Sequence, residues 1–263
     1  MDDKTFIFLG GLHRSGTSLL HQIMRSHPLV SGFQNTGAPE DEGQHLQTIY
    51  PPASEFGGPG RFGFDERSFM SESHSLASTS NAGKLFSEWG ERWDLRRDYL
   101  IEKSPPNLVR ARFLQAIFPR SMFIMITRHP IAVAYATQKW SGTSIRSLIE
   151  HWLLCHERFL SDLPRLRKCL VIGYEDFVAR PQEVMDEVYR FVGINSEPLN
   201  RDVHKHLDEK YYNEWSKDHQ TTRLPLSYEE RANRFGYSFR SNACKSDFKL
   251  EAFLKSRRGL PGF

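Results

Sequence analysis

The stretch Phe6-Ile-Phe-Leu-Gly-Gly-Leu-His-Arg-Ser-Gly-Thr-Ser-Leu-Leu20 decides the fold of this chain. Its four apolar residues from Phe6 to Leu9 predict a strand that is buried on both faces. A glycine-containing loop follows, and Thr17 opens an amphipathic helix. The N–H groups of such a loop converge on one point, and the helix N-terminus adds partial positive charge there. The stretch therefore predicts a binding site for phosphate or a similar anion.

The loop departs from the motif that binds nucleoside triphosphates in one position. Gly11 and Gly16 have the spacing of that motif, but Thr17 stands where it requires lysine. The cation lies earlier, as Arg14, inside the loop. A guanidinium binds phosphate or sulfate with two hydrogen bonds, but it does not reproduce a lysine that reaches a terminal γ-phosphate. The loop therefore predicts a phosphate binder, and the missing lysine argues against an ATPase or a kinase.

Residues 10–20, GGLHRSGTSLL, resemble the 5′-phosphosulfate loop of sulfotransferases. These enzymes use 3′-phosphoadenosine-5′-phosphosulfate (PAPS) as donor and release adenosine-3′,5′-bisphosphate (PAP). The loop is most similar to those of the protein-tyrosine and Golgi glycan branches, and the resemblance extends over about residues 5–195. It implies no metal, and it implies that the cofactor is bound by Arg14, Ser15, Gly16, Thr17 and Ser18.

Composition and charge are those of an ordinary globular protein. The chain has 263 residues, of which 39% are hydrophobic and 25% charged, and its net charge is +3. This weak positive charge suits an anionic ligand, and no motif indicates nucleic acid as a partner. The three cysteines show no paired or metal-binding spacing, which indicates a reducing compartment. We expect a cytoplasmic protein, because no leader and no membrane-spanning apolar run is evident.

Strands and helices alternate along most of the chain. This alternation predicts an α/β fold with a P-loop-like parallel sheet that helices flank on both faces, in a single domain over residues 1–263. After the first strand we expect strands at 29–33, 99–103, 122–126 and 170–172, and helices at 17–27, 105–118, 130–140, 144–161 and 181–191.

Two segments are less regular than the rest. Residues 34–98 form an acceptor-side insertion, with short helices expected from Pro39 and over 80–93. Residues 200–263 form a lid and C-terminal segment, in which 213–239 is a flap over the ligand and 246–263 holds a short basic helix. The acceptor specificity is expected to lie in these two segments.

Arg128 directly follows a predicted strand, and Pro130 opens the next helix. The resemblance implies that Arg128 binds the 3′-phosphate of the nucleotide. The family usually adds a serine in the following helix, where this chain has Ala136. Either Thr137 takes over that role, or the phosphate has one ligand fewer. The glycine-rich C-terminal loop that also binds this phosphate in the cytosolic branch is not found, although Arg240 and Lys245 lie in that part of the chain.

Lys103 and Tyr174 complete the cofactor site. The segment Glu102-Lys103-Ser104-Pro105 resembles segments that bring a lysine toward the sulfuryl group. As the bond from sulfur to the bridging oxygen lengthens, charge grows on the departing phosphate, and fixed cations stabilise that transition state. Arg14 and Lys103 are the candidates for this role. Tyr174 matches a family tyrosine that contacts the nucleotide, with a buried structural tyrosine as the alternative.

The acceptor requires a base, and Glu42 is our first choice. Asp41-Glu42-Gly43-Gln44 resembles the acidic segment of glycan N-sulfotransferases, in which the second acid is the base. Asp41 is second. Alternatively, these acids only stabilise a helix N-terminus. His13 is a rival, because histidine titrates near neutrality, and His45 is a weaker one. Gln44 and His45 are expected to steer the acceptor.

Together these features predict a sulfotransferase that transfers the sulfuryl group in line to a hydroxyl, or alternatively an amine, of a small molecule or glycan. Two other functions stay open. An ATP-dependent kinase on a related core should carry the lysine after Gly16 and a metal-binding aspartate at a strand end. A nucleotide-binding module without catalysis would have no need for Glu42, Asp41 or His13.

Overall fold

A computed structural model describes residues 1, 3–203, 208–218 and 224–240 of the chain. Five parallel strands form one sheet in the order β2-β3-β1-β4-β5, so the first strand lies at its centre. The predicted fold class is confirmed. The strands are β1 Thr5–Gly10, β2 Val30–Gly32, β3 Tyr99–Lys103, β4 Ser121–Thr127 and β5 Cys169–Gly173.

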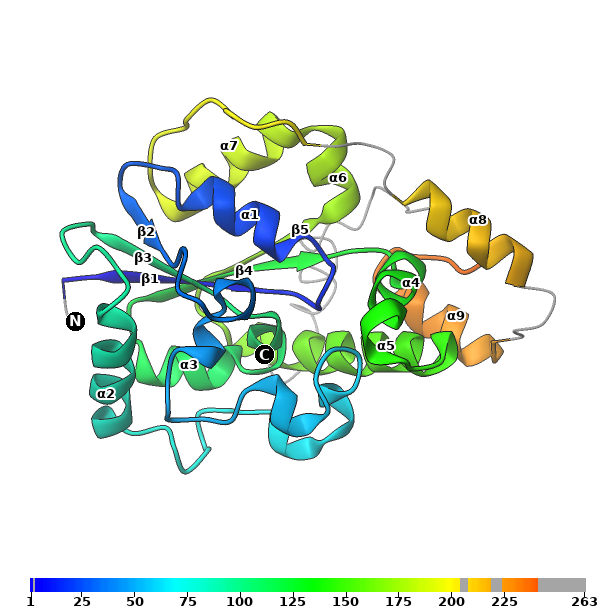
Figure 1. Ribbon diagram of the computed structural model, residues 1–263, viewed down its shortest axis with the longest axis horizontal. Helices are drawn as coiled ribbons and strands as arrows, with labels where there is room; N and C mark the ends of the chain where they lie inside the picture. Colours follow the sequence, from blue (N-terminus) through cyan, green and yellow to red (C-terminus); the bar gives the residue numbers. More distant parts are fainter. Residues whose placement is uncertain (2, 204–207, 219–223, 241–263) are drawn as a thin grey trace, which may run out of the picture.

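Alternate residues of β1 face two separate cores. Phe6 and Phe8 pack in a large aromatic core with α2, α3 and α5 on one face of the sheet, and Ile7 and Leu9 pack against α1 and α7 on the other. Figure 1 shows these two layers of helices on either side of the sheet. β1 is buried on both faces, which is why it is apolar at every position between Phe6 and Leu9.

The predicted helices are present with shifted ends. The bounds of the helices in the described residues are α1 Thr17–Met24, α2 Thr79–Gly90, α3 Ala111–Ile117, α4 Pro130–Ser141, α5 Ile145–Asp162, α6 Tyr174–Ala179, α7 Pro181–Val192, α8 Glu209–Asp218 and α9 Leu226–Asn233. α3 is shorter than predicted because residues 105–109 form a 3₁₀ turn. This turn begins with two prolines, which lack the N–H groups of a regular helix.

The prediction of a helix from Pro39 is wrong. Two 3₁₀ turns, Pro39–Asp41 and Gly43–His45, stand in its place. Glu40 and Asp41 have left-handed backbone angles, with φ of 52° and 51°, which no α-helix accommodates. The acidic residues therefore lie in a bent loop, and they do not decorate a helix N-terminus.

Two helices that the sequence did not predict, α8 and α9, follow residue 200. Tyr211 and Trp215 are buried and lie one turn apart on α8, and the indole of Trp215 donates a hydrogen bond to the Phe239 carbonyl. Arg231 on α9 pairs with Glu150 and Glu157 of α5. The predicted basic helix at 246–263 and Lys245 lie outside the described residues.

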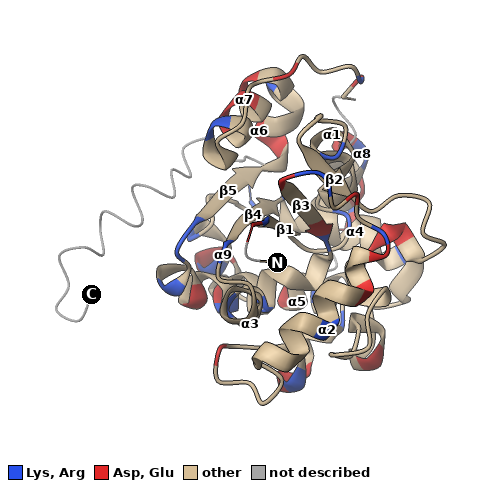
Figure 2. Ribbon diagram, turned by 90° about the vertical axis from the view of Figure 1, so that its left-hand side faces the viewer, with Lys and Arg blue, Asp and Glu red and all other residues tan. Residues whose placement is uncertain are grey.

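Acidic and basic residues are interspersed along the helices (Figure 2). This distribution agrees with the small net charge of +3.

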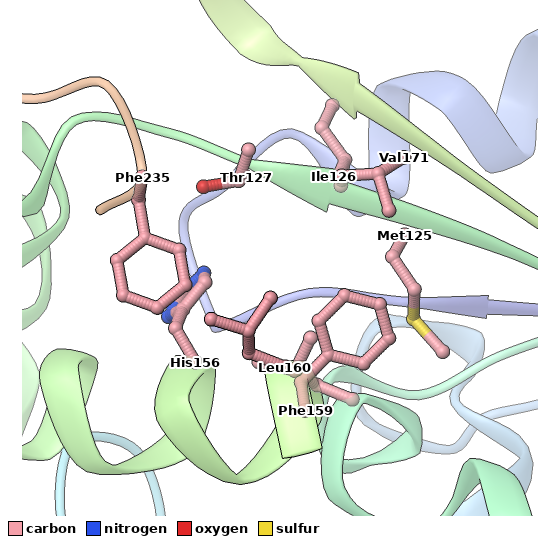
Figure 3. A pocket seen from close by; sticks show the side chains of 9 residues that line it. Met125, Ile126, Thr127, His156, Phe159, Leu160, Val171 and Phe235 are labelled. Carbon is pink, nitrogen blue, oxygen red and sulfur yellow. The ribbon is translucent and has the colours of Figure 1, made fainter. Parts of the chain in front are cut away.

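A small cavity lies between β4 and α5, close to the carboxyl end of β4 (Figure 3). Its volume is about 20 Å³, and apolar side chains line it together with Thr127 and His156. A space of this size holds one water molecule. No residue of the predicted site lines it, so it is separate from the site described next.

Candidate functional site

The loop between β1 and α1 is pressed against β4 and Tyr174. Gly11 has φ of 144°, and a Cβ there would lie 2.4 Å from the carbonyl oxygen of Ile126. Gly16 has φ of 99°, and its Cβ would lie 2.6 Å from Cδ2 of the Tyr174 ring. Only glycine fits these two positions. The ring of Tyr174 thus packs directly on the phosphate-loop backbone.

The centre of the loop offers groups suited to an anion. The hydroxyl of Ser15 is buried and has no hydrogen-bond partner among the described residues. Arg14 adopts a left-handed conformation with φ of 70°, and its guanidinium carbon lies 4.6 Å from the ring centroid of Trp140. The N-terminus of α1 follows the loop directly. A buried hydroxyl, a cation and a helix N-terminus therefore meet in one loop.

A cavity of about 310 Å³ extends over this loop. Eight residues of the predicted site line it: His13, Arg14, Gly16, Thr17, Ser18, Glu42, Arg128 and Tyr174. Six further residues that the sequence did not single out complete its wall: Leu19, Glu40, Pro105, Trp140, Lys210 and Tyr211. The phosphate loop, the predicted base and the arginine after β4 thus share one space.

Arg128 is the buried cation at the α8 end of this cavity. Its guanidinium carbon lies 4.2 Å from the centroid of the Tyr174 ring, and its Nη1 donates to the Arg14 carbonyl. Both sides of its fork also meet the carboxylate of Asp208, to which Nε donates at 3.2 Å. The indole of Trp152 donates to the Arg128 carbonyl at 3.0 Å. The arginine is therefore held rigidly between the loop and α8.

Lys103 reaches the phosphate loop from the end of β3. The residue is 1% exposed, and its Nζ donates to the Glu40 carbonyl at 2.7 Å. The same Nζ lies 3.3 Å from Oε1 of Glu42 and 3.4 Å from Oγ of Ser18. Lys103 does not itself line the cavity, but it links the carboxylate and the loop hydroxyl that do.

Glu42 is buried and firmly oriented. Oε2 accepts a hydrogen bond from Nε2 of Gln44 at 2.5 Å. Burial raises the pKa of Glu42 above its ordinary value, against the opposing effects of Lys103 and Gln44. A carboxylate with a raised pKa that faces a cavity has the properties of a general base.

Gln44 points into the protein, so its expected role in steering the acceptor is contradicted. Its backbone N–H donates to Oγ of Ser104 at 3.0 Å, and its Oε1 accepts from the Ala53 N–H at 2.8 Å. These bonds fix the amide that holds Glu42. His45, by contrast, lies at the edge of the group, with Nε2 3.9 Å from the Glu42 carboxylate.

A second buried carboxyl group, Glu102, packs against the loop that carries Glu42. It accepts hydrogen bonds from Ser104 and from Nδ2 of Asn107, the latter at 2.6 Å. Burial raises the pKa of Glu102 to about 7. A Cβ on Gly43 would lie 2.5 Å from its Oε1, so the Gly43 backbone rests on this carboxyl group. In the sequence, Glu102 stands out only as part of the segment around Lys103. No pattern in the sequence assigns it a role of its own.

Asp41 and His13 are placed differently from Glu42. The carboxylate of Asp41 accepts hydrogen bonds from the Thr36 N–H at 2.8 Å, the Thr36 hydroxyl and the Asn35 N–H. Burial alone would raise the pKa of Asp41, but these hydrogen bonds lower that pKa below its ordinary value. Asp41 does not line the cavity, and its contacts are those of a loop-fixing residue.

His13 does line the cavity. Burial and the nearby Lys103 lower the pKa of His13 to about 3. Its Nδ1 is buried and has no partner among the described residues. The imidazole therefore lines the cavity as an uncharged group at physiological pH. Its low pKa makes it a weaker base than Glu42.

Thr137 does not meet the expectation that it replaces the missing serine. It is buried on α4, and a Cβ on Gly60 would lie 3.3 Å from its Cγ2, so it faces the Gly60 loop. Neither it nor the exposed Arg240 lines the cavity. The geometry favours the alternative in which the phosphate has one ligand fewer.

Three of the residues that sequence reasoning missed come from an irregular loop or an unpredicted helix. Glu40 lies in the bent loop and accepts a hydrogen bond from Oγ of Ser18 at 3.1 Å. Lys210 and Tyr211 lie on α8, which the sequence did not predict. Trp140, at the end of α4, is 58% exposed, and nothing in the sequence distinguishes it from an ordinary helix end.

The described residues contain neither a cluster of metal-ligating side chains nor a membrane-spanning helix. No group of three or more His, Cys, Asp or Glu side chains there is arranged to hold a metal ion. In the same part of the chain, no helix combines the length and apolar character that a membrane span requires.

Protein-tyrosine sulfotransferases are among the proteins with related sequences. Protein-tyrosine sulfotransferase 1 of Danio rerio is 27% identical over 202 residues, which cover 73% of this chain and 54% of that protein. Protein-tyrosine sulfotransferase 2 of Gallus gallus is 24% identical over 204 residues, covering 73% and 52%. The chain spans about half the length of these relatives.

Solved structures share the fold. The sulfotransferase domain from the curacin biosynthetic pathway has a TM-score of 0.56 at 18% identity, covering 89% of this chain and 98% of that one. The sulfotransferase domain of the Synechococcus PCC 7002 olefin synthase has a TM-score of 0.54 at 21% identity, covering 89% and 95%.

The family itself is identified by its sequence profile, which matches residues 7–198. This span contains the phosphate loop, the Glu42 segment, Lys103, Arg128 and Tyr174, and it ends before α8. The chain belongs to the sulfotransferase family.

Proposed function

We propose that this protein transfers the sulfuryl group of PAPS to an acceptor hydroxyl, with an amine as the alternative acceptor. One observation carries the proposal: Glu42 and the phosphate loop line the same cavity, and Lys103 contacts both. An anion-binding loop without a neighbouring base would serve a binding module equally well. The buried carboxylate beside the loop favours a transferase.

We assign the 5′-phosphosulfate and the 3′-phosphate of the cofactor to two different groups of residues. The loop N–H groups, the Ser15 hydroxyl and Arg14 would hold the 5′-phosphosulfate, with Thr17 and Ser18 at the start of α1. Arg128 would hold the 3′-phosphate, and Tyr174 would contact the nucleotide between them. The buried Ser15 hydroxyl, which has no hydrogen-bond partner among the described residues, fits this group. Bound PAPS supplies the sulfuryl group.

Glu42 and Lys103 would carry out the two chemical tasks of the protein. A Glu42 oxygen accepts the proton of the acceptor hydroxyl, so the acceptor oxygen can form its new bond. The ammonium of Lys103 and the guanidinium of Arg14 stabilise negative charge that develops near the loop. Lys103 is fixed before the reaction by its contacts with Glu40, Glu42 and Ser18, so little reorganisation of this cation is required.

The kinase alternative predicts a different charge arrangement beside the loop. Triphosphate-binding loops use the hydroxyl at the Ser18 position to hold Mg²⁺. Here the ammonium of Lys103 lies 3.4 Å from that hydroxyl and already supplies positive charge. This favours sulfuryl transfer over phosphoryl transfer.

The acceptor is assigned by class only. The relatives named above are protein-tyrosine sulfotransferases. For this chain we propose a small-molecule or glycan acceptor that enters the cavity lined by His13, Pro105 and Trp140. The cytoplasmic location likewise stays a prediction.

Thermal unfolding tests the proposed cofactor. PAP should raise the melting temperature because each of its phosphates meets a cation, Arg14 at the loop and the buried Arg128, whereas ATP with Mg²⁺ should have little effect. At a hundredfold excess over the dissociation constant, the stabilisation should be about 2.7 kcal/mol. Equal stabilisation by ATP, with none from PAP, would overturn the assignment.

A further inference from the structure

Arg128 holds a carboxylate in this structure. Asp208 takes both sides of the guanidinium fork, with Nε donating to Oδ2 at 3.2 Å and Nη2 contacting Oδ1. The Asp208 side chain is only 13% exposed. A carboxylate and a phosphate compete for the same two donors of an arginine. Any phosphate that binds Arg128 with its full fork must therefore displace Asp208.

Asp208 directly precedes the first residue of α8. Its backbone carbonyl accepts the N–H groups of Tyr211 and Tyr212 at 2.9 and 3.1 Å. The first turn of α8 carries Lys210 and Tyr211 to the cavity wall. Because the carbonyl, and not the carboxylate, makes these helix bonds, the side chain can leave Arg128 without unwinding the helix.

We infer that Asp208 occupies the 3′-phosphate subsite in the free protein and competes there with the nucleotide. This inference rests on the proposed function, in which Arg128 binds the 3′-phosphate. The competition weakens the affinity for 3′-phosphorylated nucleotides, including the product PAP, and so favours product release. Nucleotides without a 3′-phosphate do not compete with Asp208, because they leave the pair of Asp208 and Arg128 in place.

The test compares two nucleotides with wild-type and variant protein by titration calorimetry. Asp208→Asn keeps the size of the side chain and removes the competing charge. It should tighten PAP binding by about tenfold or more, the order of one hydrogen bond to a charged group. The affinity for adenosine 5′-monophosphate, which lacks the 3′-phosphate, should stay unchanged. The matched control is Glu230→Gln, which removes one exposed acidic charge on α9 and should change neither affinity.

Unchanged or weaker PAP binding by Asp208→Asn would overturn the inference, since a residue that merely positions α8 or Arg128 would give that result. Absence of PAP binding to the wild-type protein would instead overturn the proposed function. If the variant does not fold, the wild-type complex with PAP decides: Asp208 should have left Arg128, and a carboxylate still bound to it contradicts the competition.

Discussion

Glu42→Gln is expected to lower turnover by about a hundredfold or more, with the fold and PAP affinity unchanged. Glutamine keeps the size of the side chain and its hydrogen-bonding capacity but has no basicity. The wild-type rate should fall on the acid side of its pH profile, because the base must be ionised and burial raises the pKa of Glu42. In the variant this acid limb should be lost. The measurement is turnover against pH with saturating PAPS.

Asp41→Asn is the matched control for this change, one residue away in the same loop. Asp41 holds Thr36 and Asn35 and does not line the cavity, so its substitution should cost less. Normal turnover by Glu42→Gln together with an inactive His13→Ala would place the base in the phosphate loop and contradict our assignment.

Lys103→Met should lower turnover by about 10²–10³-fold, the usual order for one lost electrostatic contact in the transition state. Methionine fills most of the lysine volume, so packing is largely kept while the charge is lost. PAP affinity should be nearly unchanged because Lys103 does not line the cavity. Steady-state kinetics give the turnover, and calorimetry gives the PAP affinity.

Two controls separate this role from a structural one. Lys84→Met, at an exposed lysine that pairs with Glu88 on α2, should leave turnover unchanged. In the double variant of Glu42 and Lys103 the losses should not multiply, because the two side chains form one pair. Loss of PAP binding by Lys103→Met, with turnover intact, would mean that the lysine is an anchor for the nucleotide.

The sheet and the phosphate loop could be predicted from the sequence because local patterns determine them. Strands of a parallel sheet are buried on both faces, and Phe6–Leu9 shows this as an unbroken apolar run. The glycines at 11 and 16 mark a loop whose backbone only glycine can adopt. These features require no knowledge of distant contacts.

The environment of Glu42 could not be predicted, because residues far along the chain create it. Lys103 and the Ser104 hydroxyl that fixes Gln44 lie about sixty residues away, with sequence separations of 61 and 60. The left-handed angles of Glu40 and Asp41 contradict the helix that proline and acidic residues locally favour. The hydrogen bonds from Thr36 and Asn35 to Asp41 hold that conformation.

The contribution of α8 to the cavity could not be predicted from the sequence either. Its polar residues outnumber its buried ones, so only Tyr211 and Trp215 signal a packed face. The ion pair between Asp208 and Arg128 joins residues 80 positions apart. Sequence reasoning therefore identified the arginine but not the carboxylate that meets it.

The crystal structure of the complex with PAP tests the central claim most directly. We predict the 5′-phosphate on the loop at residues 14–18, the 3′-phosphate on Arg128, and Glu42 facing the space beyond the 5′-phosphate where an acceptor would bind. PAP bound outside this cavity, or PAP in it with Glu42 turned away from the 5′-phosphate, would contradict the account.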